Sequence, residues 1–503
     1  MPSSFYENDT GSESFSGSST KFSSIPASSN TSDADRSSGR ESWSLKRSLN
    51  RIHNSRTTRG AEEGGEVEDQ AREQFRQASY SSLGSFRAPQ GPIFSLCWAG
   101  KDLDHGLLIA GSQDSHISLW QCFHRSENDG ALIHLSDFAK LGDGGCVKSL
   151  LQITHKGRAL VLSAHQDNKI RVWKTVELLK INEFDSIAKN SNRSFTMKLL
   201  ATLPRPRDVA RSCMFPARYV RVRRHKTCLW LQHTDAISSL ASSHDGSLVF
   251  SSSWDRSVKV WRVSDLRCLQ SFRAHDDAIN ALVASPEGFL YTGSADSMIR
   301  VWKKGGSDRK KKFALLATLF HETLSKSVSN GSTAVNALVL GGEFLYAGLS
   351  DSTIAVWEKS LAGVVLDDRD RDHDDPYMSC VERLRGHRGA VLCLGRAGGL
   401  LCSGSADATV RIWSIEFGGL GGHCCLGVLK GHTGPIKSLV VVAMDPALPR
   451  EKNDDFYNDS AEGDHGEGEE ERAFCIYSGG LDRQIRAWRV RASRNSTPRS
   501  KSG

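Results

Sequence analysis

Apolar and polar residues alternate with period two in short segments along most of this chain. In "ATVRIW", Val410 and Ile412 point to one side and the residues between them point to the other, which is typical of a β-strand. A short apolar strand such as "GLLCSG" precedes this one, and a Gly, Ser and Asp turn joins the two. An earlier strand, such as "AVLCLGR", comes before both. Three strands of one unit and one from its neighbour predict a four-stranded antiparallel sheet.

A fixed spacing marks these units, because the Asp of each turn is followed six residues later by a Trp. The spacing occurs seven times, at Asp114–Trp120, Asp167–Trp173, Asp255–Trp261, Asp296–Trp302, Asp351–Trp357, Asp407–Trp413 and Asp482–Trp488. Sheets stacked radially cover both faces of each other, and closing the circle removes the long exposed edges. The pattern therefore predicts an all-β ring of seven blades.

Each buried Trp of such a ring needs an acceptor for its indole N–H, because an unpaired buried donor costs about 1–3 kcal/mol. In the sixth unit, a Ser lies four residues before the turn Asp, and a His stands at the start of the unit. We expect these residues to form one hydrogen-bonded network, made of His387, Ser403, Asp407 and Trp413.

This combination of residues resembles the WD40-repeat family, and the resemblance spans roughly residues 80–490. It implies a seven-bladed WD40 β-propeller, with repeats at about 91–121, 144–174, 233–262, 275–303, 332–358, 387–414 and 432–489. The family's His–Ser/Thr–Asp–Trp tetrad maps in full onto four units. These are His233, Ser251, Asp255 and Trp261; His275, Thr292, Asp296 and Trp302; His387, Ser403, Asp407 and Trp413; and His432, Ser478, Asp482 and Trp488.

The other three units depart from the family's pattern. The second keeps Ser163, Asp167 and Trp173 but has Asp143 at the His position. The first and fifth have alanine in place of the hydroxyl and lack the His, with Ala110 and Pro89 in one and Ala347 and Gly331 in the other. The Asp that usually follows the Trp is absent from all seven units.

The two ends of the repeat region are expected to meet in one blade. The residues after Trp488, "RVRASRNSTPRSKSG", are too polar for the outer strand of the last blade. Near the other end, "SSLGSFRAPQGPIFSL" aligns with "RCLQSFRAHDDAINAL", so Ser82–Arg87 is expected to supply that strand and close the ring. We therefore divide the chain into a disordered Ser-rich arm (1–79), the propeller (80–490) and a basic tail (491–503).

Composition and motifs argue against several functions. The chain has 503 residues, a formal net charge of +7, 38% hydrophobic and 24% charged residues, which is ordinary for a globular protein and argues against direct binding of nucleic acid. We find no signal peptide or membrane span. Phosphate-loop and nucleophile-elbow motifs are absent, and "HETLS" at His321 lacks the second ligand of a zinc protease. We expect a non-enzyme with no cofactor or metal, and a monomer.

Propellers bind partners through loops on a rigid ring. The WD40 topology implies that the turn before each Asp and the start of each first strand open onto one face. That face would carry the candidate partner-binding residues Phe94, Gln113, Lys148, Gln166, Trp254 and Lys437. Exposed aromatic residues beside lysines would suit an acidic or phosphorylated peptide. The alternative is that Trp254 only packs over its own turn.

Phrases such as "FRAHDDAINAL" and "LRGHRGAVLCL" resemble plant WD-repeat proteins of the Jingubang type. This resemblance implies a scaffold that recruits transcription or signalling proteins in development, in the cytoplasm and nucleus. A second hypothesis is a substrate receptor of a cullin-based ubiquitin ligase, although "WRVR" (488–491) lacks the acid of the W-D-x-R ending used there. A third is RNA or membrane binding through Arg221, Arg223, Arg224 and the basic loop 309–312.

Overall fold

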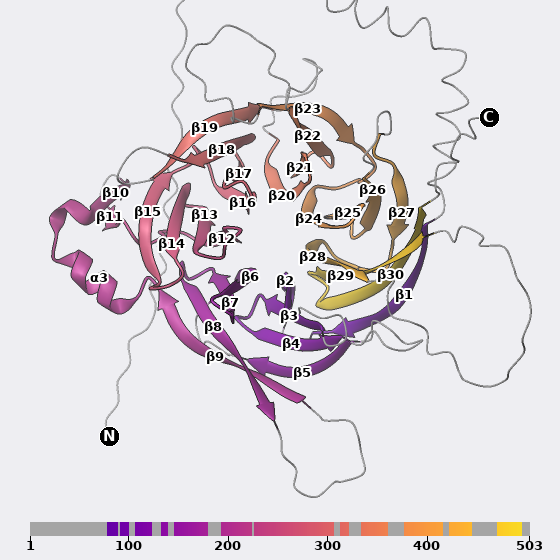
Figure 1. Cartoon of the computed structure of the whole chain (residues 1–503), viewed down its shortest axis with the longest axis horizontal. Helices are drawn as coiled ribbons and strands as arrows, with labels where there is room; N and C mark the ends of the chain where they lie inside the picture. The colour runs from indigo at the N-terminus through magenta and orange to yellow at the C-terminus, as the bar shows by residue number, and fades with distance from the viewer. Residues whose placement is uncertain are drawn as a thin grey trace, which may run out of the picture. The chain divides into compact units, whose positions relative to one another are not determined.

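The computed structural model describes residues 78–88, 91–99, 106–122, 132–138, 145–179, 193–223, 226–305, 312–320, 333–360, 377–415, 422–444 and 470–494. The chain divides into two units, 1–69 and 70–503, and all described residues belong to the second. These residues form seven four-stranded antiparallel sheets arranged as a ring (Figure 1). The predicted seven-bladed, nearly all-β propeller is confirmed.

Each blade is a meander of four strands. Blade 1 consists of β2 (Ile93–Ala99), β3 (Gly106–Ser112), β4 (Ile117–Cys122) and β5 (Leu132–Phe138), and blade 2 of β6 (Val147–His155), β7 (Arg158–His165), β8 (Ile170–Leu179) and β9 (Arg193–Leu203). Blade 3 consists of β12 (Ile237–Ser242), β13 (Leu248–Ser253), β14 (Ser257–Arg262) and β15 (Arg267–Arg273), and blade 4 of β16 (Ile279–Ala284), β17 (Leu290–Ser294), β18 (Met298–Lys304) and β19 (Phe313–Phe320).

The second half of the ring repeats this arrangement. Blade 5 consists of β20 (Val335–Gly341), β21 (Phe344–Leu349), β22 (Ile354–Ser360) and β23 (Tyr377–Leu384), and blade 6 of β24 (Val391–Ala397), β25 (Leu400–Ser405), β26 (Val410–Ser414) and β27 (Cys425–Leu429). Blade 7 contains β28 (Ile436–Met444), β29 (Glu470–Gly480) and β30 (Gln484–Arg494), with β1 (Ala78–Arg87) as its outer strand.

The ring closes because β1 pairs with β30 along its length, from Ala78 opposite Ala492 to Arg87 opposite Gln484. Two predicted boundaries need correction. The strand begins at Ala78, inside the predicted arm, and β30 runs to Arg494, inside the predicted tail. Both extensions follow from the same pairing, since Ala78 and Ala492 pack against the core between blades 6 and 7.

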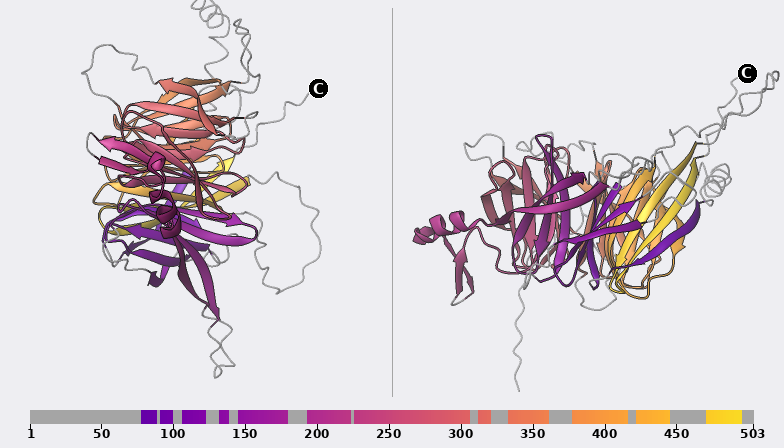
Figure 2. Two further views of the ribbon diagram at one scale, coloured as in Figure 1. Left: turned by 90° about the vertical axis from the view of Figure 1, so that its left-hand side faces the viewer. Right: turned by 90° about the horizontal axis from the view of Figure 1, so that it is seen from below.

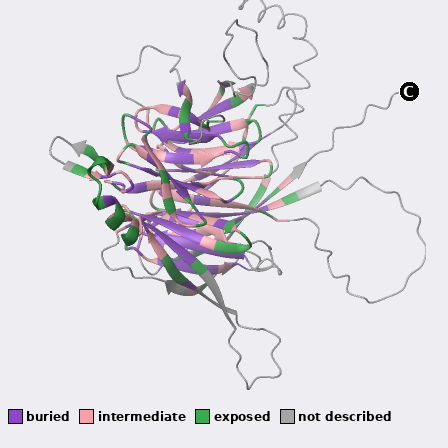
Figure 3. Cartoon of the chain, turned by 60° about the vertical axis from the view of Figure 1, so that its left-hand side comes forward, coloured by how far each residue is buried: buried purple, intermediate pink, exposed green. Residues whose placement is uncertain are grey.

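The apolar core lies between neighbouring blades rather than at one centre. The described residues form seven buried clusters, and each joins two adjacent sheets. One cluster joins blades 5 and 6 and contains Tyr346, Val356 and Trp413. Burial is therefore distributed around the whole ring (Figure 3). Losing one blade would expose to water the sheet faces of both neighbours that had packed against it.

An appendage interrupts the ring between blades 2 and 3. It contains α3 (Pro206–Cys213), the 3₁₀ turn η2 (Pro216–Arg218) and a hairpin of β10 (Tyr219–Arg223) and β11 (Lys226–Leu229). Pro206 at the first position of α3 has the φ that a helix needs. The appendage stands out from the edge of the ring (Figure 2). No described helix has the length and apolar character needed to cross a membrane.

Candidate partner-binding face

A backbone hydrogen bond that recurs in every blade defines one face of the ring. The residue just before each turn Asp donates its N–H to the carbonyl of the residue that precedes the inner strand, as from Trp254 to Ala236 (3.1 Å) and from Gln166 to Cys146 (3.0 Å). The turns and the starts of the inner strands therefore open together, on what we call the turn face. The residues before the turn Asp are Gln113, Gln166 and Trp254 in blades 1–3 and Ala295, Ser350, Ala406 and Leu481 in blades 4–7.

Three of the predicted residues meet on this face. The Nζ atom of Lys148, in β6, lies 4.8 Å from the ring centroid of Phe94, in β2, and 4.8 Å from that of Trp254, in the turn after β13. A lysine ammonium between two aromatic rings is attracted to both π faces. Trp254 is nevertheless 41% exposed. We call Phe94, Lys148 and Trp254 the aromatic–lysine cluster, and it spans blades 1, 2 and 3.

The other three predicted residues lie nearby on the same face. Lys437, in β28 of blade 7, is half-buried, and burial lowers the pKa of its ammonium, to which the charge of Lys148 adds. Gln113 and Gln166 are exposed at the turns of blades 1 and 2. Among the described residues, no hydrogen bond joins either glutamine side chain to the cluster. The two lysines make this part of the face positively charged.

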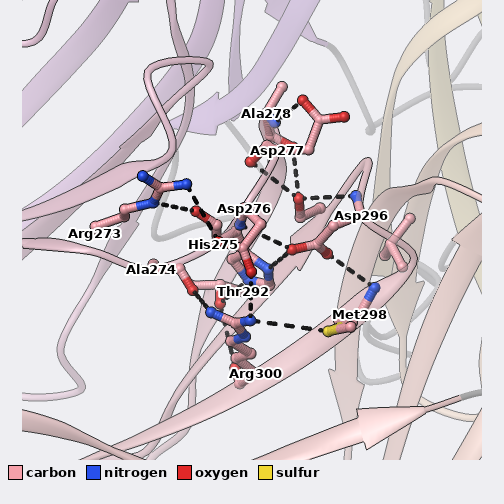
Figure 4. A network of polar contacts seen from close by, with 12 residues as sticks. Arg273, Ala274, His275, Asp276, Asp277, Ala278, Thr292, Asp296, Met298 and Arg300 are labelled. Atoms are coloured by element: carbon pink, nitrogen blue, oxygen red, sulfur yellow. Dashed lines mark hydrogen bonds and ion pairs between the residues drawn. The ribbon is translucent and has the colours of Figure 1, made fainter. Parts of the chain in front are cut away.

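The four full tetrads lie inside their blades as closed hydrogen-bonded networks. In blade 4, His275 Nδ1 is 2.9 Å from Asp296 Oδ2, and His275 Nε2 is 2.7 Å from Thr292 Oγ1 (Figure 4). Trp302 Nε1 donates to the same Thr292 oxygen at 3.0 Å. Because a carboxylate only accepts, Nδ1 carries the proton and Nε2 accepts from the hydroxyl. Blades 3, 6 and 7 repeat these bonds.

The tryptophan N–H groups of the three incomplete units differ in their hydrogen bonding. In blade 2, Trp173 Nε1 donates to Ser163 Oγ (2.8 Å), and His165, from the end of β7, hydrogen-bonds to that oxygen at 2.8 Å. In blade 1, Trp120 Nε1 donates to Ser118, two residues before it (2.9 Å). In blade 5, the buried Trp357 Nε1 has no partner among the described residues. The predicted stand-ins Pro89, Asp143 and Gly331 lie outside the described residues.

The titratable groups of these networks are held in the charge states that burial and hydrogen bonding favour. Burial lowers the pKa of His387, and the hydrogen bond from its ring to Asp407 only partly opposes this. Burial acts to raise the pKa of Asp407, but hydrogen bonds from Thr409, the Arg388 N–H and His387 together lower it to about 2. Neutral His beside ionised Asp suits a fixed structural network. These groups are engaged within the blade rather than open to a substrate.

His165 is expected to make the protein sensitive to acid. Burial, with a further contribution from the Arg171 charge, lowers its pKa to about 4 from an ordinary value of 6.5. As the pH falls, His165 therefore takes up its proton in the unfolded chain before it does so in the folded one. Its contribution to the free energy of unfolding is fully present above pH 6.5 and is lost as the pH falls towards 4. Urea denaturation at pH 7 and at pH 4.5 measures how much the free energy of unfolding falls between the two. For His165→Gln this fall is expected to be about 2 kcal/mol smaller than for the unchanged protein. His244→Gln, at an exposed histidine, should lose as much as the unchanged protein, and equal losses for both variants would contradict this assignment.

The predicted basic loop 309–312 falls largely outside the described residues, and only its Lys312 is described, which is exposed. Arg221, in β10, is exposed, whereas Arg224 is not described.

Comparison with known proteins supports the WD40-repeat family for this chain. The family model "WD domain, G-beta repeat" matches residues 226–262, 266–303 and 378–414. Mitochondrial division protein 1 of Schizosaccharomyces pombe is 26% identical over 221 residues, which are 41% of this chain and 33% of that protein. Nuclear distribution protein PAC1 of Candida glabrata is 30% identical over 188 residues (34% and 39%). The guanine nucleotide-binding protein subunit beta of Arabidopsis thaliana is 29% identical over 197 residues (38% and 45%).

These alignments extend over less than half the length of each of these curated relatives. Each matched family segment contains one complete tetrad, namely those of blades 3, 4 and 6. WD40 propellers typically serve as non-catalytic scaffolds that bind proteins or peptides.

Proposed function

We propose that this protein is a non-catalytic scaffold that docks protein partners on the turn face, at the aromatic–lysine cluster. The position of Lys148 Nζ, 4.8 Å from both aromatic rings, carries this proposal. The lysine holds the Trp254 ring in place, yet the ring stays substantially exposed. A rigid aromatic side chain that is ordered before binding loses little entropy when a partner covers it. Such residues supply much of the energy of protein interfaces.

The charge of the face favours an acidic or phosphorylated peptide segment. Lys148 and Lys437 come from different blades, and burial already disfavours the charged form of Lys437. A negative group from a partner would offset that cost, because it stabilises the ammonium form. The neighbouring turn residues Gln113 and Gln166 are exposed and have amide groups that would hydrogen-bond to a peptide backbone.

The finer part of the proposal follows the resemblance to Jingubang-type plant proteins. On that reading the partners are transcription or signalling regulators in development, and the protein acts as a monomer in the cytoplasm and nucleus. The sequence phrases "FRAHDDAINAL" and "LRGHRGAVLCL" support it. Blades 3, 4 and 6, which contain these phrases or adjoin them, also match the family model.

Proximity labelling in plant cells tests this function. In the Phe94→Ala/Trp254→Ala variant, labelling of bound regulators should fall at least about tenfold, because each aromatic anchor typically contributes about 2 kcal/mol or more to the binding free energy. A matched control is Leu315→Ala/Val381→Ala, which removes two apolar side chains that are each 49% exposed on the outer strands of blades 4 and 5. Thermal denaturation should show all three proteins folded.

Two outcomes would overturn the proposal. Equal labelling by both double variants would show that the cluster is not the docking site. A labelled set dominated by adaptors of a cullin-based ubiquitin ligase would favour the substrate-receptor hypothesis instead.

A further inference from the structure

A second site lies away from the centre of the turn face, where the appendage meets blade 3. Here the β10–β11 hairpin and the strands and turn of blade 3 enclose a cavity of about 510 Å³. Val220, Arg221 and Trp230 line it from the appendage, and Trp254, Lys259 and Phe272 are among those that line it from the blade. Of the aromatic–lysine cluster, only Trp254 borders this cavity.

A buried ammonium group forms part of the cavity wall. Lys259, in β14, is only 3% exposed, and its Nζ donates to the Trp230 carbonyl (2.6 Å) and to Ser271 Oγ (2.7 Å). The bond to the Trp230 carbonyl links the appendage to the blade, whereas Ser271 lies on the neighbouring strand β15 of blade 3. An ammonium has three N–H donors, and no third acceptor for Lys259 occurs among the described residues. Its pKa is lowered because burial disfavours the charged form. A buried cation in this position is stabilised by an anion.

The rim of the cavity adds positive charge. Arg221 and Arg256 are exposed, and neither forms an ion pair within the described part of the chain. The lining holds two acidic residues against four basic ones, Arg221, Arg256, Lys259 and Arg273. Asp255 belongs to the tetrad of blade 3, and Asp235 Oδ1 accepts from the Ala236 N–H (2.7 Å). The electrostatics of the cavity therefore favour a negatively charged ligand.

Apolar side chains complete the walls and indicate what accompanies that charge. Val220 is 52% exposed, and Trp254 and Phe272 offer aromatic surface. A small inorganic anion would leave this apolar surface uncovered, whereas a peptide would cover it with a neighbouring side chain. We propose that the cavity binds an acidic peptide segment of a protein partner, with a carboxylate bonded to Lys259 Nζ and an apolar residue against Val220 and Trp254.

Fluorescence anisotropy with the full chain tests this site. The probe is a fluorescein-labelled, glutamate-rich peptide centred on phenylalanine, and its control is the same peptide with glutamine in place of every glutamate. We expect the glutamate peptide to bind and the glutamine peptide to bind at least about tenfold more weakly, because charge-assisted hydrogen bonds are the stronger ones. Arg221→Glu should weaken binding of the glutamate peptide by a similar factor, and Lys259→Met by as much or more.

Arg158→Glu, at an exposed residue at the start of β7, makes the same charge change elsewhere and should leave binding unaltered. Because Lys259→Met also removes a support of the appendage, Arg221→Glu decides the result if that variant fails to fold. Unchanged binding by Arg221→Glu, or equal binding of the two peptides, would overturn the proposal.

Trp254 borders both sites, so the Phe94→Ala/Trp254→Ala variant alters both, and the single Phe94→Ala variant is needed to separate them. Phe94→Ala alters the aromatic–lysine cluster but not the cavity, so it should leave peptide binding intact. If the glutamate peptide binds but no regulators are labelled, only the docking function is contradicted. If regulators are labelled but the peptide does not bind, only the cavity site is contradicted.

Discussion

Replacing Ser403 with alanine is expected to destabilise the ring by about 2–4 kcal/mol, because two buried polar groups lose their partner at once. The Ser403 hydroxyl is fully buried, 2.9 Å from Trp413 Nε1 and 2.8 Å from His387 Nε2. Alanine leaves the indole N–H without an acceptor and the imidazole without a donor. Urea denaturation followed by tryptophan fluorescence should show the loss as a lower midpoint.

Blade 5 provides the reciprocal change in the same protein. Ala347 stands where blades 2, 3, 4, 6 and 7 carry the hydroxyl, and the indole N–H of Trp357 is buried without a partner in the described structure. Ala347→Ser should therefore stabilise the protein by about 1 kcal/mol, the usual net value of one buried hydrogen bond. Asp276→Ala, at a side chain that is 72% exposed, serves as a neutral control. If Ser403→Ala cost no more than Asp276→Ala, the tetrad would not be the source of blade stability.

The ring itself could be predicted from sequence because its determinants are local. The hydroxyl and the Trp of each tetrad lie on two strands joined by one tight turn, so a constant spacing sets their register. In blade 4, for example, Thr292 lies opposite Arg300, two residues before Trp302. Long insertions do not disturb this register, since they fall outside the hairpin that joins the hydroxyl to the Trp.

The exceptions could not be predicted in the same way. His165 reaches Ser163 from the end of the same strand, and Ser118 reaches Trp120 along its own strand. Neither occupies the position where the family pattern places the partner. A Ser-x-His sequence before the turn Asp was the only signal for the first, and its meaning depends on how the ring is buried.

The appendage and its cavity were also outside the reach of sequence patterns. Its helix and hairpin are short, and what holds them is Lys259, a residue of the following blade that bonds to the Trp230 carbonyl. Similarly, the sequence placed Phe94, Lys148 and Trp254 on one face, but the position of the ammonium between the two rings depends on side chains from three blades.

Removing β1 is expected to have the largest effect, because this strand joins the two ends of the ring. Its backbone completes blade 7 by pairing with β30, and the Phe86 ring packs edge-on against Trp120 of blade 1 at 6.3 Å. Ala88, which is buried, donates its N–H to the Arg483 carbonyl (2.9 Å) and belongs to the core between blades 7 and 1. Deletion of residues 1–88 would leave β30 as an unpaired edge and open that core to water.

Two truncations separate closure from a general effect of shortening the chain. A protein lacking residues 1–75 retains all of β1 and should show the same cooperative thermal transition as the full chain, measured by circular dichroism. A protein lacking residues 1–88 should lose that transition and elute as an expanded or aggregated species in size-exclusion chromatography. Adding a peptide of residues 76–88 to the shorter protein should restore part of the transition, since the unpaired edge of β30 presents the hydrogen bonds that β1 satisfies. Equal melting of the two truncations would mean that the other blades close the ring without this strand.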